Sequence, residues 1–146
     1  MRHKKKKHTK KNIVVTDEHK KIGFLGETTN GKEHDLPILK EDGFFDRIPE
    51  DIPIHFDLGF QGVATDFPKI NSILPKKKPK DKDLTENDKE QNAAKSQIRV
   101  LVENAIGGVK RLKIVSDVFR NRKIDFVDTA MLVTCGIWNF HLAQMT

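Results

Sequence analysis

Two acidic residues stand out because of where the sequence places them. The alternating apolar stretch IHFDLGFQG, at residues 54–62, ends on Asp57 and then turns through two glycines. Glu103 lies further along, in a segment whose apolar residues recur with a helical period. Carboxylate oxygens are preferred ligands of Mg²⁺ and Mn²⁺. If the strand end and the helix converge, Asp57 and Glu103 form part of a metal site suited to phosphodiester cleavage.

Each acid also has an ordinary structural interpretation, and the residues alone leave both open. Asp57 precedes Leu58-Gly59 and can serve as a turn acid. Glu103 lies four residues after Arg99, so the two can form a surface ion pair worth about 0.3–0.5 kcal/mol. On a helical wheel Glu103 falls roughly 140° from Ile98, on the polar flank of the apolar stripe.

The composition predicts one compact domain with a modest core. The chain has 146 residues, of which 36% are hydrophobic and 33% charged. The single cysteine, Cys135, excludes an intramolecular disulfide and a cysteine-based zinc cage, and it fits a reducing compartment. The basic start MRHKKKKHTKKN is followed by no apolar run of signal-peptide length, and no window is long enough to span a membrane. These features predict a cytoplasmic protein with no membrane partner.

The N-terminal half predicts strands around one short helix. Residues 12–19 and 21–30 form two β-branched runs joined by a polar turn, which indicates a hairpin. The stretch 34–49 predicts a short helix that ends at Gly43. Residues 51–57 predict a strand, and 70–79 contain one more.

The pattern changes to helices from about Thr85, which with Asp88 forms a plausible cap. An apolar stripe follows at helical spacing, through Ile98, Leu101, Val102, Ala105, Ile106, Val109 and Leu112. Gly107 and Gly108 interrupt it and should each cost roughly 1 kcal/mol relative to alanine, which suggests a close packing contact, a bend or a helix end. Residues 126–145 predict a second apolar helix.

The net charge of +6 is concentrated in three clusters, at residues 2–11, 76–82 and 110–123. Clustered cations release counterions from a phosphate backbone, so a polyanion is the natural partner. Solvated tails and loops are the alternative. The predicted DNA-binding residues are Lys76, Lys77, Lys78, Lys80, Lys110, Arg111, Arg120 and Arg122.

Five motifs occur in one order along the chain: KKKKHTKKNIVV, HDLPIL, DLGFQG, LPKKKPK and RVLVENAIGGVKRLKIVSDVFRNR. In that order they resemble the catalytic domain of DDE-type transposases of bacterial insertion sequences, the DDE superfamily endonucleases. The resemblance implies an α/β fold, ribonuclease H-like, with a mixed sheet flanked by helices. It also implies DNA transposition by metal-dependent cleavage and strand transfer, with Mg²⁺ or Mn²⁺ held by an Asp, Asp, Glu triad.

The resemblance assigns roles to individual residues. Asp57 matches the second aspartate of the triad and Glu103 matches its glutamate, so both are expected to be catalytic and to bind metal. His34 and Asp35 match a pair expected to support the site. Their alternative is structural, with Asp35 capping a helix and His34 packed beside it.

The first aspartate and first strand of the family would lie upstream of this chain. We therefore expect residues 1–146 to be a truncated catalytic domain, either a C-terminal piece or the second product of a split frame. Its parts would be a basic lead-in (1–11), strands and a short helix (12–79) and C-terminal helices (85–146). The missing strand should leave an unpaired edge and an uncovered apolar face. The lone chain should then be poorly stable and need an upstream fragment or another transposase subunit.

Two other functions remain possible from the sequence. One is a catalytically inactive basic DNA-binding remnant, which the absent first aspartate favours. The other is a small RNA-binding protein, suggested only by charge and size. Few aromatic residues lie near the basic clusters, which argues against base stacking in single-stranded RNA.

Overall fold

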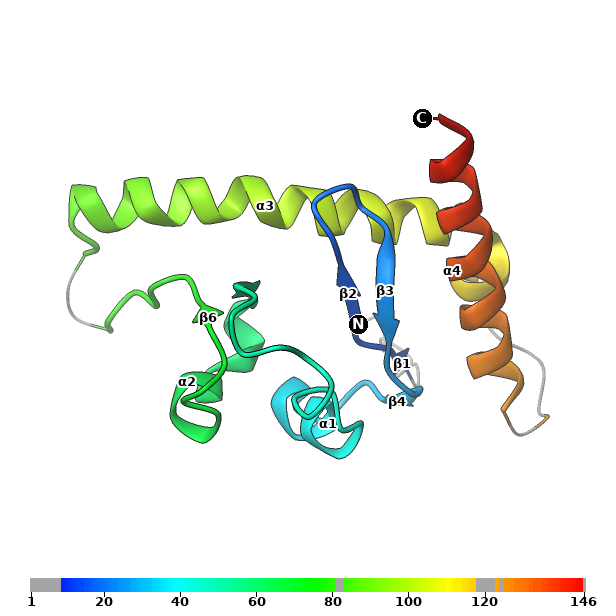
Figure 1. Cartoon of the computed structure of the whole chain (residues 1–146), viewed down its shortest axis with the longest axis horizontal. Helices are drawn as coiled ribbons and strands as arrows, with labels where there is room; N and C mark the ends of the chain where they lie inside the picture. Colours follow the sequence, from blue (N-terminus) through cyan, green and yellow to red (C-terminus); the bar gives the residue numbers. More distant parts are fainter. Residues whose placement is uncertain (1–8, 81–82, 118–122, 124, 146) are drawn as a thin grey trace, which may run out of the picture.

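The computed structural model describes residues 9–80, 83–117, 123 and 125–145, and they form a mixed α/β structure. Figure 1 shows a long helix, α3, running beside a hairpin and two smaller strand segments, with α4 near its C-terminal end. The elements in chain order are β1 (Lys10–Lys11), β2 (Val14–Thr16), β3 (Ile22–Leu25), β4 (Thr29–Asn30), α1 (Asp35–Glu41), β5 (Ile54–His55), η1 (Leu58–Phe60), α2 (Val63–Asp66), β6 (Ser72–Ile73), α3 (Glu86–Lys110), η2 (Lys113–Val115) and α4 (Phe126–Met145).

The described strands pair in three separate two-stranded sheets. β2 and β3 form the predicted hairpin, β1 pairs with β4 in the same antiparallel sense, and β5 pairs with β6 in parallel. Helix α3 contacts both β2 and β5, so it connects the hairpin to the β5–β6 pair. The α/β class is confirmed, whereas one continuous ribonuclease H-like sheet stays a prediction.

The main core lies between α1, β5 and the hairpin. The phenylalanines contact one another here: Phe44 packs edge-on against Phe24 with ring centroids 4.9 Å apart, and Phe45 stacks on Phe67 at 3.9 Å. Phe44 is only 1% exposed, and it is the largest of the fully buried side chains among the described residues. Helix α1 ends at Glu41, just before Gly43, whose φ of 64° favours glycine, so the predicted stop is confirmed.

A second core joins the hairpin to the two long helices, around Ile22, Val109 and Cys135. Cys135 is buried among apolar groups, and this desolvation raises the pKa of its thiol. The Asn139 side chain on α4 makes two hydrogen bonds with the backbone of Ile22, accepting from its N–H at 2.8 Å and donating to its carbonyl at 2.8 Å. These two bonds hold the outer edge of β3 against α4, which protects that edge from further pairing.

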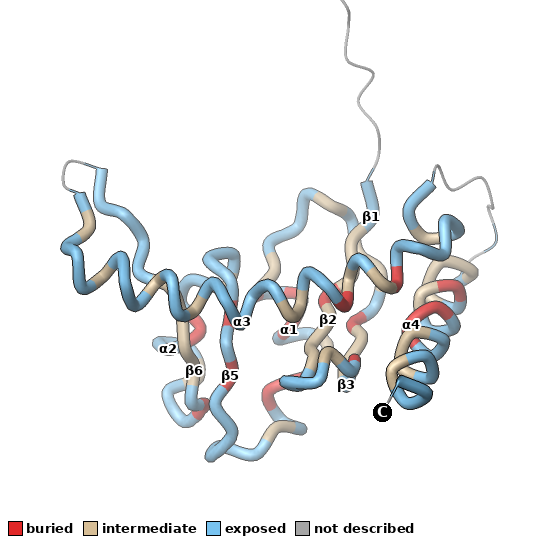
Figure 2. Tube along the Cα trace, turned by 90° about the horizontal axis from the view of Figure 1, so that it is seen from above, coloured by how far each residue is buried: buried red, intermediate tan, exposed pale blue. Residues whose placement is uncertain are grey.

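The apolar stripe of α3 is only partly covered. Ala105 and Val109 are fully buried, as predicted, but Ile98 is 37% exposed and Leu112 36% exposed, so the stripe as a whole is not core. Figure 2 shows the N-terminal half of α3 largely exposed, with buried residues only in its C-terminal half. The helix is longer than the two small sheets beneath it, and they cannot cover its full apolar face.

Among the residues that the structure describes, no helix is both long and apolar enough to cross a bilayer.

Candidate functional site

Asp57 lies where the chain leaves the β5–β6 sheet. The last ladder bond is donated by the Phe56 N–H to the Ile73 carbonyl at 2.9 Å, and the next residue, Asp57, is the N-cap of η1. The Asp57 side chain accepts a hydrogen bond of 2.7 Å from the Leu58 N–H, so the predicted turn role is real. That bond leaves the rest of the carboxylate available, and the side chain is 53% exposed.

The two glycines after Asp57 are required for different reasons. Gly62 has a φ of 97° where it starts α2, a conformation that side chains rarely adopt. Gly59 lies against the Asp35 carboxylate, and a Cβ there would come within 2.5 Å of the Asp35 Oδ2. Asp35 is in turn held by the Lys11 Nζ at 2.6 Å. The glycines therefore let the loop that carries Asp57 pack tightly on α1.

The structure corrects the alternative interpretation of the His34–Asp35 pair. His34 is itself the N-cap residue of α1 and makes no side-chain cap bond, while Asp35 is the first helical residue. His34 is exposed and is not packed beside a capping acid. The Asp35 carboxylate does not cap the helix because it pairs with the Lys11 ammonium and lies against Gly59.

Gly59→Ala should lower the free energy of unfolding by about 1–3 kcal/mol, because the new methyl group overlaps the Asp35 carboxylate. In an Asp35→Ala background the same change should cost much less, since only the Cβ of residue 35 then faces it, at 3.9 Å. Urea unfolding of the four proteins of this cycle measures the difference. Equal costs in the two backgrounds would show that the contact does not matter.

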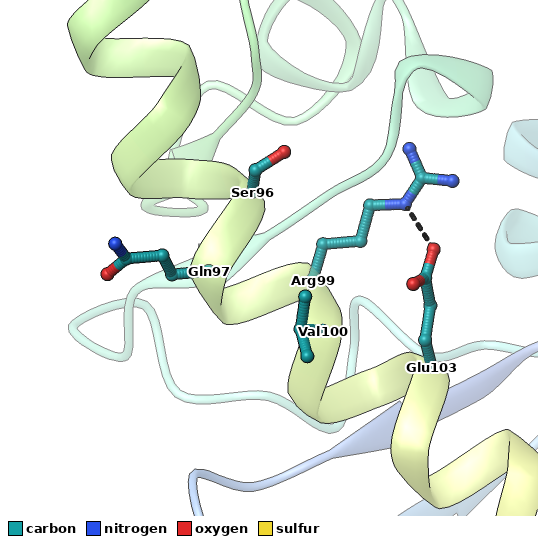
Figure 3. A pocket seen from close by; sticks show the side chains of 5 residues that line it. All are labelled: Ser96, Gln97, Arg99, Val100 and Glu103. Atoms are coloured by element: carbon teal, nitrogen blue, oxygen red, sulfur yellow. Dashed lines mark ion pairs between the residues drawn. The ribbon is translucent and has the colours of Figure 1, made fainter.

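Glu103 lies on α3, and the structure places it near Asp57. The Arg99 guanidinium contacts both acids: its Nε is 3.1 Å from the Glu103 Oε1 and its Nη1 is 3.7 Å from the Asp57 Oδ1. Figure 3 shows Arg99 extended along the helix with its guanidinium beside Glu103. One side chain thus contacts both the acid after β5 and the acid on α3, and the predicted Arg99–Glu103 ion pair is present. That the two carboxylates share one cation stays a prediction.

The shared ion pair is open to solvent. The side chains of Asp57, Arg99 and Glu103 are 53%, 59% and 57% exposed, so each pair contributes at most about 1 kcal/mol to folding. A hollow of about 380 Å³ lies on this side of the helix (Figure 3). It is lined by Ser96, Gln97, Arg99, Val100 and Glu103. The two carboxylates are therefore accessible from solution, although Arg99 contacts an oxygen of each.

The donor set fits a hard divalent cation, although only in part. Two carboxylates supply oxygen ligands of the kind that Mg²⁺ and Mn²⁺ prefer. Within the described residues, however, no group of three or more His, Cys, Asp or Glu side chains is close enough to enclose a metal. Asp57 and Glu103 therefore offer part of a coordination shell, and further ligands must come from water or from outside the described residues.

The lysine segment after β6 is anchored along the first half of α3. The Asn92 side chain accepts from the Lys76 N–H at 2.9 Å and donates to the Lys76 carbonyl at 3.1 Å. The Lys95 Nζ donates to the Leu74 carbonyl at 2.7 Å. The hydrogen bond from the Lys76 ammonium lowers the pKa of Asp88. The Asp88 N–H donates the capping hydrogen bond to the Thr85 Oγ1 at 3.2 Å. The role of Asn92 was not predicted from the sequence, because its partner, Lys76, is distant in the chain.

Cationic side chains lie on both sides of the acid pair along α3. At 1.5 Å per residue, Asn92 and its bound Lys76 are about 16 Å before Glu103, and Lys110 is about 10 Å after it. Lys77, Lys78, Lys80, Lys110 and Arg111 are all exposed, while Arg120 and Arg122 lie outside the described residues. A phosphate backbone running along this helix would meet positive charge at either end and the two acids between.

Comparison with known sequences decides the family. The sequence model described as DDE superfamily endonuclease matches residues 2–139. The chain belongs to the DDE superfamily of endonucleases. It is also similar to a probable transposase for insertion sequence element IS702 from Microchaete diplosiphon, with 33% identity over 136 residues. That match covers 92% of this DDE endonuclease chain but 46% of the relative, so the chain spans about half the relative's length. No solved structure matches the chain.

Proposed function

We propose that this chain supplies part of the catalytic centre of a DNA transposase, with Asp57 and Glu103 as metal-binding carboxylates. The observation that carries the proposal is the contact of one guanidinium with both acids, at 3.7 and 3.1 Å, from two elements far apart in sequence. Family membership supports the endonuclease chemistry, and the similar protein from Microchaete diplosiphon is named a transposase. Neither acid is needed for the core, since both side chains are more than half exposed.

Each residue has a defined part in the proposed reaction. A bound Mg²⁺ or Mn²⁺ would supply Lewis-acid stabilisation of the charge that develops during phosphodiester cleavage and strand transfer. Asp57 presents an oxygen from the rigid end of β5, and Glu103 presents one from α3. The exposed lysines of 76–80, with Lys110 and Arg111, contact phosphates and so position DNA without reading its sequence. Arg120 and Arg122 are proposed for the same task.

The remaining ligand is proposed to come from an upstream part of the transposase. Among the described strands β2 pairs only with β3, whose other edge is closed by Asn139. Helix α3 contacts both β2 and β5, and we propose that a further strand binds between these two strands. A strand with an aspartate at its end, bound beside β2, would bring a third carboxylate toward Asp57 and Glu103. The His34–Asp35 pair would support the site by holding the loop after Asp57.

Calorimetric titration of residues 1–146 with Mn²⁺ tests the proposal. We expect one weak site that Asp57→Ala abolishes. The control is Asp51→Ala, which removes the same charge from an exposed position before β5 and should leave the titration unchanged. If the Asp57→Ala titration matches that of the unchanged chain, the metal site is wrong, and the chain is better described as a basic DNA-binding remnant.

A further inference from the structure

The contact that joins the two acids involves a positive charge of the chain itself. The Arg99 guanidinium lies at the two oxygens, Asp57 Oδ1 and Glu103 Oε1, that a shared cation would contact. We propose that Arg99 occupies the cation position of the Asp57–Glu103 pair and competes there with the divalent metal. This inference rests on the proposed function, because it concerns the loading of that same site.

The distances explain why the two cations exclude each other. Metal–oxygen bonds are much shorter than an ion pair, about 2.0–2.1 Å for Mg²⁺, whereas the Arg99 contacts are 3.1 and 3.7 Å. An ion that contacts both carboxylates would have to bind the oxygens that the guanidinium now contacts. A divalent ion and a guanidinium a few Å apart would also repel each other. Arg99 must therefore leave when the metal binds.

The side chain is suited to such a role. Arg99 is 59% exposed and lies in the open hollow of Figure 3, so it can rotate into solvent without disturbing the core. A guanidinium keeps its charge at every physiological pH, so it offsets one of the two negative charges whenever the metal is absent. Without it, Asp57 and Glu103 would both lose their Arg99 ion pair. Arg99 would thus hold the half-formed site together and at the same time weaken its metal affinity.

A positioning role and a competing role of Arg99 predict opposite changes in metal affinity when Arg99 is removed. If Arg99 only positions the two carboxylates for the metal, removing it should weaken metal binding. If it competes for their oxygens, removing it should strengthen metal binding. The sign of one measured change therefore separates the two roles.

The experiment is a Mn²⁺ titration of residues 1–146 carrying Arg99→Gln. We expect at least about fivefold tighter binding than in the unchanged chain, as the loss of a unit charge close to the site implies. The control Lys89→Gln removes the same charge from the same helix, where Lys89 pairs with Glu86 at 2.6 Å. Because it is about 21 Å from Glu103 along α3, beyond the screening length, it should change the affinity by less than about twofold. Arg99→Lys, which keeps the charge, should stay near the unchanged chain.

The outcomes separate this inference from the proposed function. Equal or weaker Mn²⁺ binding by Arg99→Gln, while Asp57→Asn still abolishes the titration, overturns the competing role of Arg99 and leaves the metal site standing. If Asp57→Asn leaves Mn²⁺ binding intact, or if neither the unchanged chain nor Arg99→Gln binds Mn²⁺, both fail. Far-ultraviolet circular dichroism of each variant verifies that the helices are retained, and tighter binding by Arg99→Gln cannot arise from unfolding.

Discussion

Gly108→Ala should lower the free energy of unfolding by about 2 kcal/mol, although alanine is the better helix former. A Cβ at Gly108 would overlap the ring of Trp138 on α4, far inside van der Waals contact. To avoid it, the indole would have to move and lose the hydrogen bond that its Nε1 donates to the Lys20 carbonyl at 2.9 Å. The overlap outweighs the gain of about 1 kcal/mol in helix propensity.

The adjacent glycine provides the control. No atom lies within 4 Å of a Cβ built at Gly107, which is exposed, so Gly107→Ala should raise the stability by up to about 1 kcal/mol. Urea unfolding followed by circular dichroism measures both variants. Stabilisation by Gly108→Ala equal to that by Gly107→Ala would mean that α3 and α4 do not pack as described.

The second large effect concerns catalysis. With Mn²⁺ and the upstream half of the transposase supplied, Asp57→Asn and Glu103→Gln should each slow DNA cleavage by at least about 100-fold. Each change removes one charged metal ligand while keeping the shape of the side chain, and metal-based stabilisation is worth several kcal/mol at about 1.4 kcal/mol per tenfold in rate. A plasmid-nicking assay measures the rates.

The control for this experiment keeps the charge change and moves it away from the site. Asp51→Asn alters an exposed acid before β5 and should leave the cleavage rate within about twofold, as distant surface charges are screened. DNA binding at moderate salt should be retained by all three variants, because the phosphate contacts come from the cationic side chains. Cleavage at an unchanged rate by Asp57→Asn or Glu103→Gln would remove that residue from the catalytic centre.

Local sequence patterns predicted the elements well. Helical periodicity, the Thr85 cap and the glycine stop at Gly43 are properties of neighbouring residues, and α1, α3 and α4 lie where these signals placed them. The packing contact suggested by Gly107-Gly108 also exists, but it belongs to Gly108 alone. Which of two adjacent glycines faces Trp138 depends on how α4 crosses α3, and no local pattern contains that information.

The site was predicted in part. A strand ending at Asp57 and a helix carrying Glu103 could be inferred from the sequence, and the spacing of four residues indicated the Arg99–Glu103 pair. The contact of Arg99 with Asp57 could not, because it joins elements separated by α2, β6 and the lysine segment. The side-chain amides of Asn92 and Asn139 likewise bond backbone groups that are distant in the sequence, so these contacts could not be predicted either. Exposure of Ile98 and Leu112 was missed because periodicity shows which face is apolar but not how much of it is covered.

We propose above that Asp57 and Glu103 hold one divalent cation between them. Anomalous X-ray diffraction from a crystal of this chain soaked in Mn²⁺ tests it most directly. We expect a single manganese peak within coordination distance of both carboxylates, with Arg99 turned away from them. A peak bound to one acid alone, or no peak while Arg99 still contacts both acids at high Mn²⁺ concentration, would contradict it.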